Sequence, residues 1–152
     1  MGKVDSDQEI LEFAIFRENE AHNFFIALAG RVADSNIKKM LEDLAAEELE
    51  HKEKLELEIM KNGRTVSTEL KPPRPSSDYI LADDLVQLDM DVRDVLLMGM
   101  EKEEASFRIF VNMIPNVHDE QSRELLLALA EEEVKHKLRF ETEYNNLLHK
   151  KI

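Results

Sequence analysis

Residues 44–51 read Leu-Ala-Ala-Glu-Glu-Leu-Glu-His, and residues 129–136 read Leu-Ala-Glu-Glu-Glu-Val-Lys-His. In both stretches a histidine follows a glutamate by three residues, a spacing that puts the two side chains on one face of a helix, one turn apart. A single Glu-x-x-His is weak evidence in a chain so rich in glutamate, because a surface pair is its usual explanation. Two such motifs in related positions need another explanation.

The two stretches belong to an internal repeat. When the chain is shifted by 85 residues, so that position 51 falls on position 136, residues 10–60 align without gaps on residues 95–145. The shared turn, the shared histidine and the absence of gaps favour duplication, and each half is predicted to be one helical hairpin. The identical pairs include Leu11/Leu96, Glu18/Glu103, Phe25/Phe110, Val32/Val117, Asp34/Asp119, Leu41/Leu126, Leu44/Leu129, Ala45/Ala130, Glu47/Glu132, Glu48/Glu133, His51/His136 and Lys52/Lys137.

Few residues interrupt the helical pattern, and they indicate where helices begin and end. A capping-box spacing opens the chain, an Asn-Gly pair ends the first half, and a Pro-Asn pair divides the second half. These signals predict helices from Ser6 to about Val32, from the turn and N-cap at Asp34-Ser35-Asn36 to Lys61, from Asp89 or Asp91 to Ile114, and from Asp119 nearly to the end.

The connection over residues 63–88 differs in kind, because three prolines cluster there beside two serines. We expect it to be a crossover rather than a domain boundary, with a short helical turn near residues 82–88. The sequence therefore predicts one all-α domain over residues 1–152. It would be a four-helix bundle of two hairpins, at about residues 7–62 and 89–150, with one long crossover.

Each predicted helix carries a seam of apolar residues at alternating spacings of three and four, and a glutamate interrupts each seam near its middle. In antiparallel hairpins these interruptions fall at comparable depth, so we expect four carboxylates and two imidazoles to converge in one layer of the core. The predicted metal-ligating residues are Glu18, Glu48, His51, Glu103, Glu133 and His136.

A buried layer of four carboxylates needs compensating charge. Burial shifts the pKa of a carboxyl group upward by as much as ~3–5 units, and four such groups also repel one another. Two divalent cations would balance four carboxylates, and one Glu from each of two helices with Glu-x-x-His from each of the others is the ligand set of di-iron and di-manganese bundles. The donors suit iron or manganese and permit zinc. The alternative is a core whose acids are protonated or hydrated.

The composition excludes several other classes of function. The chain has no cysteine, which rules out thiolate catalysis and cysteine-ligated zinc or iron–sulfur sites. Its 33 acidic and 20 basic residues give a net charge of −13, which repels nucleic acid and anionic lipid. No run approaches the ~18–20 apolar residues of a membrane span, and no signal-peptide pattern occurs. We therefore expect a cytoplasmic protein.

Other side chains compete for a role beside these six. Glu101 and Glu104 flank Glu103 and offer another register, but the heptad and the repeat both select Glu103. His22 lies four residues after Glu18, beside the seam, and is expected at the rim, although an assisting role stays open. The remaining candidates are expected to be solvated or, for methionine, core filling: Glu47, Glu50, Glu131, Glu132, His118, His149, Met90, Met98, Met100 and Met113.

At residues 14–25, 46–51, 100–110 and 132–136 the chain resembles the ferritin-like superfamily, and within it rubrerythrin-type proteins without a rubredoxin domain. The resemblance implies that Glu48 and Glu133 bridge two iron ions, with Glu18 and Glu103 as terminal ligands. It also implies that His51 and His136 each complete one iron. Such proteins react with oxygen or peroxide, oxidise Fe(II), or both, which suggests a role in oxidative stress.

The chain also departs from that family. Ser106 stands where peroxide-reducing members carry a further carboxylate, and Phe25 and Phe110 replace tyrosines common near such centres. Without a rubredoxin domain, reduction requires a separate electron-donor protein. We expect an oxidoreductase acting on Fe(II), O2 or peroxide; the alternative is a non-catalytic bundle that sequesters metal or has a structural role. Apolar flanks expected to be exposed suggest a homodimer: Phe13, Phe16 and Phe24.

Overall fold

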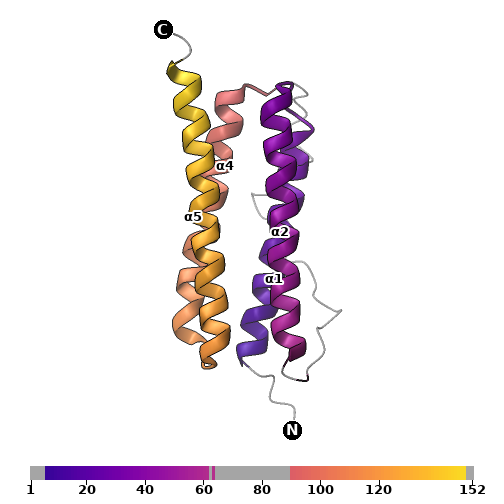
Figure 1. Ribbon diagram of the computed structural model, residues 1–152, viewed down its shortest axis with the longest axis vertical. Coiled ribbons are helices and arrows are strands. Elements are labelled where there is room, and N and C mark those ends of the chain that lie inside the picture. The colour runs from indigo at the N-terminus through magenta and orange to yellow at the C-terminus, as the bar shows by residue number, and fades with distance from the viewer. Residues whose placement is uncertain (1–5, 62, 64–89, 150–152) are drawn as a thin grey trace.

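The computed structural model describes residues 6–61, 63 and 90–149, and within these residues it is helical with no strand. The long helices are α1 (Ser6–Ala29), α2 (Ser35–Lys61), α4 (Val92–Met113) and α5 (Glu120–His149), with the 3-10 turn η2 (Ile114–Asn116) between the last two. Figure 1 shows them as a four-helix bundle, and the all-α prediction is confirmed. The expected crossover and its helical turn near residues 82–88 lie outside the described residues.

The helices pack as two antiparallel hairpins, α1 on α2 and α4 on α5, which lie side by side in Figure 1. Just before α4, the backbone N–H of Met90 donates to the carbonyl of Arg31, in the turn after α1, at 2.7 Å. At the other end of the bundle, Lys61 donates to Gln121 at 2.6 Å, which joins the end of α2 to the start of α5. The helix α2 therefore ends, and α4 begins, at opposite ends of the bundle.

Short side chains fix the helix starts close to their predicted positions. Asp34 accepts from the backbone N–H groups of Asn36 and Ile37 at the start of α2. Asp91 and Asp119 cap α4 and α5 in the same way. Each cap satisfies backbone donors that have no partner within the helix.

The helix ends agree with the sequence except in α1. Gly63, with φ of 76°, follows α2 in the left-handed conformation that glycine supplies at helix C-termini. The helix α1 was expected to continue to about Val32 but ends at Ala29, because Gly30 and Arg31 form a turn whose N–H groups bond to the carbonyls of Ile26 and Leu28.

The core consists of two apolar clusters, one toward each end of the bundle. Phe25 and Phe140 belong to the first cluster, and Leu55 and Phe110 to the second. Along every helix the buried glutamate of the seam lies between the two clusters. The polar residues therefore form a layer that divides the core, as the interrupted seams predict.

One buried ion pair outside this layer joins the hairpins on another side. Glu20 of α1 and Lys102 of α4 are both almost fully buried, with 3.6 Å between the Lys102 Nζ and a Glu20 carboxylate oxygen. Arg17 approaches the same oxygen at 2.7 Å. The Lys102 Nζ also lies 5.2 Å from the ring centroid of Phe24, within range of a cation–π contact.

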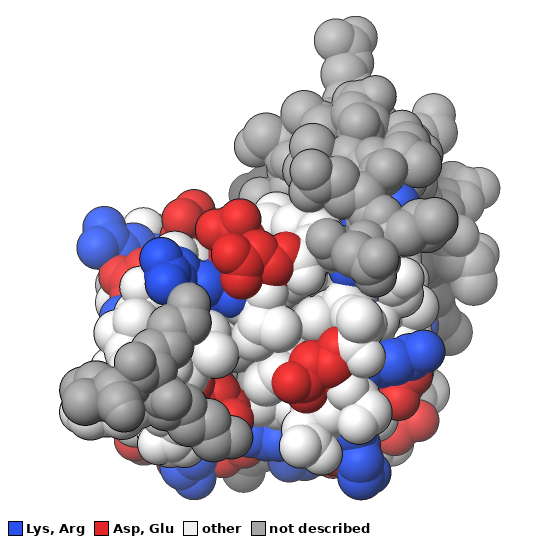
Figure 2. All heavy atoms as spheres, turned by 90° about the horizontal axis from the view of Figure 1, so that it is seen from above, with Lys and Arg blue, Asp and Glu red and all other residues white. Residues whose placement is uncertain are grey.

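The surface corrects one expectation. Phe16 and Phe24 are buried within the chain, because α1 buries a face wider than its seam and Phe24 packs edge-to-face on Phe25. Of the three predicted apolar flanks only Phe13 is exposed, at 44%. Figure 2 shows acidic and basic side chains interspersed around one end of the bundle. In the described part of the chain, no helix has the length and hydropathy needed to cross a membrane.

Candidate metal centre

The structure brings all six predicted metal-ligating side chains into one buried layer at the middle of the bundle. Each helix contributes a glutamate, and the two helices that carry Glu-x-x-His also contribute an imidazole. All six are 3% exposed or less: Glu18 on α1, Glu48 and His51 on α2, Glu103 on α4, and Glu133 and His136 on α5.

Within each hairpin one carboxylate pairs with one imidazole. The Nδ1 atom of His51 lies 2.9 Å from Glu18 Oε2, joining α2 to α1. The Nδ1 atom of His136 lies 3.0 Å from Glu103 Oε2, joining α5 to α4. These two contacts occupy equivalent positions of the repeat, so each hairpin supplies the same half of the layer.

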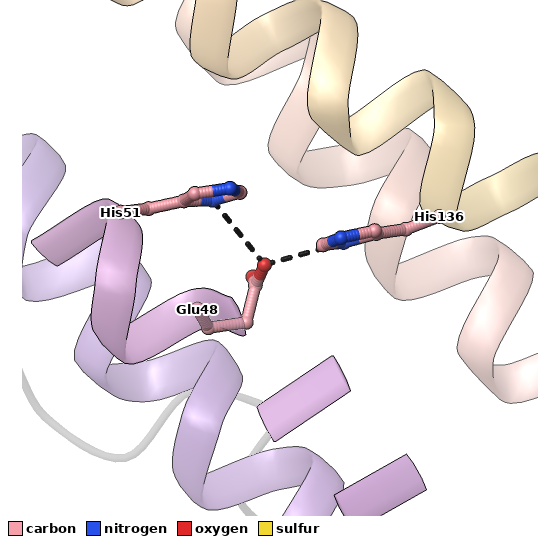
Figure 3. A group of neighbouring side chains, drawn as sticks. All are labelled: Glu48, His51 and His136. Carbon is pink, nitrogen blue, oxygen red and sulfur yellow. Dashed lines mark ion pairs between the residues drawn. The ribbon is translucent and has the colours of Figure 1, made fainter. Parts of the chain in front are cut away.

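The other two glutamates lie between the histidines. Figure 3 shows Glu48 approaching both rings, with Oε1 3.5 Å from the Nδ1 of His51 and 3.3 Å from the Nδ1 of His136. Glu133 Oε1 lies 3.4 Å from the Nδ1 of His51. Two overlapping sets therefore have ligand atoms within 4.8 Å of one another, and they share Glu48 and Glu133: Glu18, Glu48, His51 and Glu133, and Glu48, Glu103, Glu133 and His136.

Several buried carboxylate oxygens of this layer make no hydrogen bond. They are both oxygens of Glu48, both oxygens of Glu133 and Oε1 of Glu103, counted against the described residues. The imidazole nitrogens 3.3–3.5 Å away do not meet hydrogen-bonding geometry, since each Nδ1 is already directed at Glu18 or Glu103. Leaving a buried polar atom without a partner costs roughly 1–3 kcal/mol and more when charged. Unpaired carboxylate oxygens together with imidazole nitrogens fit a metal site.

Burial and mutual repulsion raise the pKa of three of these carboxyls. For Glu18 burial contributes most, followed by repulsion from Glu48 and Glu133, and its pKa is well above the usual range. The same causes raise the pKa of Glu103. Burial and repulsion from Glu133 raise the pKa of Glu48 to about 7. The pKa of Glu133 is lowered, because contacts with His51 and Glu103 outweigh its burial.

The pKa values of the two histidines are raised although both side chains are buried. Burial alone disfavours the imidazolium, but the contacts of His51 with Glu133 and Glu18 raise its pKa to about 10. Glu103 and Glu48 raise the pKa of His136 to about 12 in the same way. The neighbouring carboxylates therefore favour the protonated form of both imidazoles.

The other side chains considered as metal ligands lie outside the buried layer. His22 is half-buried and its Nδ1 donates to the carbonyl of Ala45 at 2.9 Å. Glu104 pairs with Lys137 and Arg108 at 2.8 and 2.7 Å, and Glu101 is exposed. None of these three side chains belongs to the ligand-atom groups formed by the described residues. The two histidines predicted to be solvated make hydrogen bonds away from the layer. The side chain of His118 contacts the carboxylate of Asp7, and that of His149 contacts the carbonyl of Asn145.

One contact of the layer was not predicted from the sequence. Glu47, expected on a solvated face, is 35% exposed and accepts a hydrogen bond from the Nε2 of His136 at 2.9 Å. Arg139 donates to its other oxygen at 2.8 Å. Glu132 lies nearby, in a third group whose ligand atoms are within 4.8 Å of one another. The sequence offered one signal for this contact, since both halves of the repeat carry a glutamate at this position, Glu47 and Glu132.

Comparison with known proteins agrees with this geometry. The family model described as Rubrerythrin matches residues 9–144, which include both hairpins and all six side chains of the layer. A comparison with curated proteins found no match.

Proposed function

The chain belongs to the rubrerythrin family, and we propose that its buried glutamate–histidine layer binds two iron ions and reacts with O2 or peroxide. One observation carries the proposal: buried carboxylate oxygens of Glu48, Glu103 and Glu133 have no hydrogen-bonding partner among the described residues. Two divalent ions would satisfy these oxygens and balance the four carboxylates. Manganese or zinc would suit the same donors.

The pairings of the layer support a division of roles. Glu48 and Glu133 belong to both overlapping ligand sets, which favours them as bridging ligands. Glu18 with His51, and Glu103 with His136, would each complete one ion. Each histidine would bind through Nδ1, the nitrogen that is directed into the layer.

Two Fe(II) ions bound here would supply two electrons, which with two protons reduce one hydrogen peroxide to two waters and leave two Fe(III). The chain itself contributes apolar surroundings. Phe25 and Phe140 close the layer from one side and Phe110 and Leu129 belong to the cluster on the other, all 1% exposed or less. Such apolar surroundings restrict water and influence the potential of a metal site.

Return to the ferrous state would require an electron donor from outside the described residues. We propose a separate donor protein and a cytoplasmic location, where a chain without cysteine loses nothing to the reducing conditions.

The alternative is a bundle that holds metal without turnover. The buried Ser106, at the position where the resemblance leads us to expect a carboxylate in peroxide-reducing members, favours this alternative over peroxide reduction. Oxidation of Fe(II) by O2 stays compatible with the six-ligand set.

Anaerobic reconstitution with Fe(II) tests the proposal. We expect two iron ions per chain and a rapid rise in Fe(III) absorbance when O2 or peroxide is added. Glu48→Gln should lose bound iron, whereas Glu50→Gln, which changes an exposed glutamate two residues away, should retain it. Fewer than one ion per chain in the unmodified protein would refute metal binding. Full loading without any oxidation would leave sequestration as the function.

A further inference from the structure

His136 is held at both nitrogens of its ring. Its Nδ1 faces the layer, 3.0 Å from Glu103 and 3.3 Å from Glu48. Its Nε2 faces the outside of the layer and donates to Glu47 Oε1 at 2.9 Å. Glu47 is itself fixed through its second oxygen by Arg139 at 2.8 Å. The ring is therefore clamped between ligands of the candidate centre and a surface ion pair.

The equivalent histidine of the first repeat lacks this clamp. His51 Nδ1 contacts Glu18, as His136 Nδ1 contacts Glu103, but no described residue accepts a hydrogen bond from the Nε2 of His51. Glu132 is the repeat equivalent of Glu47, yet it pairs with Lys135 of its own helix at 3.0 Å.

The sequence explains this difference between the repeats. Lys135 stands where the first repeat has Glu50, and Arg139 stands where it has Lys54. In the second repeat a lysine thus holds Glu132 on α5, and an arginine holds Glu47 toward His136. The two halves have diverged around their histidines while keeping all six residues of the layer.

The hydrogen bond to Glu47 has a direct chemical consequence. A neutral imidazole that offers the lone pair of Nδ1 to a metal carries its proton on Nε2, and a carboxylate that accepts this proton fixes the tautomer and the ring orientation. Removing such a partner typically lowers metal affinity by roughly 10–100-fold.

We propose that Glu47 is a positioning residue for His136 and that it makes the two metal positions unequal. The ion held by Glu103 and His136 binds more tightly, and the ion held by Glu18 and His51 is the more readily lost. This inference rests on the proposed function, since it requires two ions in the layer.

Ligand atoms of Glu47, Glu132 and His136 lie within 4.8 Å of one another, so the alternative role for these side chains is to bind a third ion. The contacts favour positioning over a third ion. The Nε2 that donates its proton to Glu47 cannot at the same time offer a lone pair, and Arg139 already supplies positive charge to this carboxylate.

Metal titration of the full chain separates these cases. Metal-free protein is titrated with Mn(II), with a chelator of known affinity as competitor. The unmodified protein should bind two ions with distinct affinities. Glu47→Gln should weaken the tighter step by about 10–100-fold, while the matched variant Glu132→Gln should leave both steps unchanged. Glu47→Asp, which keeps a carboxylate, should recover part of the loss.

A second readout reports on the ring itself. In Zn(II)-loaded protein with 15N-labelled histidine, the NMR signal of His136 should show a protonated Nε2, and this signal should shift in Glu47→Gln but not in Glu132→Gln. Circular dichroism of both metal-free variants verifies that they fold.

Three results would overturn the inference. Equal affinities for the two ions would do so, as would equal losses in Glu47→Gln and Glu132→Gln. A third bound ion that disappears in both variants would assign the trio as ligands instead. These results leave the proposed function standing, whereas binding of fewer than two ions by the unmodified protein would refute that function as well.

Discussion

The imidazole rings of His51 and His136 lie parallel across the middle of the bundle, with centroids 5.7 Å apart and planes inclined by 7°. One ring comes from α2 and the other from α5, so they meet only when the two hairpins dock. Glu48 on α2 reaches both of them. The layer is therefore a property of the assembled bundle, and ligands that bind it should stabilise the docked state.

Metal binding should raise the thermal stability of the chain. A ligand at 100 times its Kd stabilises the folded state by about 2.7 kcal/mol, which corresponds to a rise of about 5–10 °C in Tm for a chain of this size. We expect this rise with Mn(II) or Fe(II) in calorimetry of the unmodified protein. Glu48→Ala with His51→Ala should abolish it. An unchanged Tm on metal addition and on chelation would contradict metal binding in the layer.

The metal-free protein should lose stability as the pH rises above neutrality. The pKa of His51 is about 10 and that of His136 about 12 in the folded chain, against 6.5 as the ordinary value. Between pH 6.5 and about 10 the folded state therefore binds more protons than the unfolded state, and the free energy of unfolding falls with pH. This contribution is fully present below pH 6.5.

The carboxyl groups of the layer also contribute to the dependence of stability on pH. The raised pKa values of Glu18 and Glu103 act in the same direction, and the lowered pKa of Glu133 acts against it at acidic pH. Urea unfolding of metal-free protein at pH 6.5, 8 and 9.5 measures the slope. Stability that increases over this range would show that the imidazoles are neutral in the folded state.

Metal binding at pH 7 should release protons. Both imidazoles hold a proton in the metal-free chain because their pKa values lie above 7, and a metal-bound imidazole nitrogen must be free of it. We expect at least about two protons per chain on full loading, with further contributions from Glu48, whose pKa is about 7, and from Glu18 and Glu103, whose pKa values are raised. Calorimetric titrations in buffers of different ionisation enthalpy give this number, and a value near zero would contradict the proton-loaded layer.

Gly99 should be intolerant of a larger side chain. A Cβ at this position would overlap the ring of Phe140, which is fully buried and stacks on Phe25 with centroids 5.8 Å apart. We expect Gly99→Ala to destabilise the protein by about 1–3 kcal/mol, measured by urea unfolding. Gly30→Ala is the control, since its Cβ would meet the nearest atom at an ordinary 3.5 Å.

The repeat supplies a rescue for that variant. The first half has Ala14 and Leu55 where the second half has Gly99 and Phe140. Adding Phe140→Leu to Gly99→Ala should therefore remove the overlap and recover part of the lost stability. Additive losses in the double variant would show that the overlap with Phe140 is not the cause.

The sequence predicted the bundle and the layer because both depend on local periodicity. Each seam glutamate interrupts an apolar stripe on its own helix, and the repeat places Glu18 and Glu103 in equivalent positions without any knowledge of contacts. Such patterns reveal which face of a helix is buried.

The contacts of Glu47 could not be predicted in this way. Glu47 lies next to the seam residue Glu48, and its partners His136 and Arg139 are 89 and 92 residues away. Which nitrogen of His136 faces outward depends on the docking of α5 against α2, which periodicity does not specify. The burial of Phe16 and Phe24 was missed for a related reason, since it depends on what covers the flank of the seam.

Neither hairpin carries the whole layer, so bound ions would hold the two hairpins together. Glu48 of the first hairpin approaches His136 of the second, and Glu133 of the second approaches His51 of the first. In the proposed loaded state the ions would act as cross-links between the hairpins, in a chain that has no cysteine to form a disulfide. The integrity of the bundle would then follow the supply of metal and the acidity of its surroundings rather than the redox state of thiols.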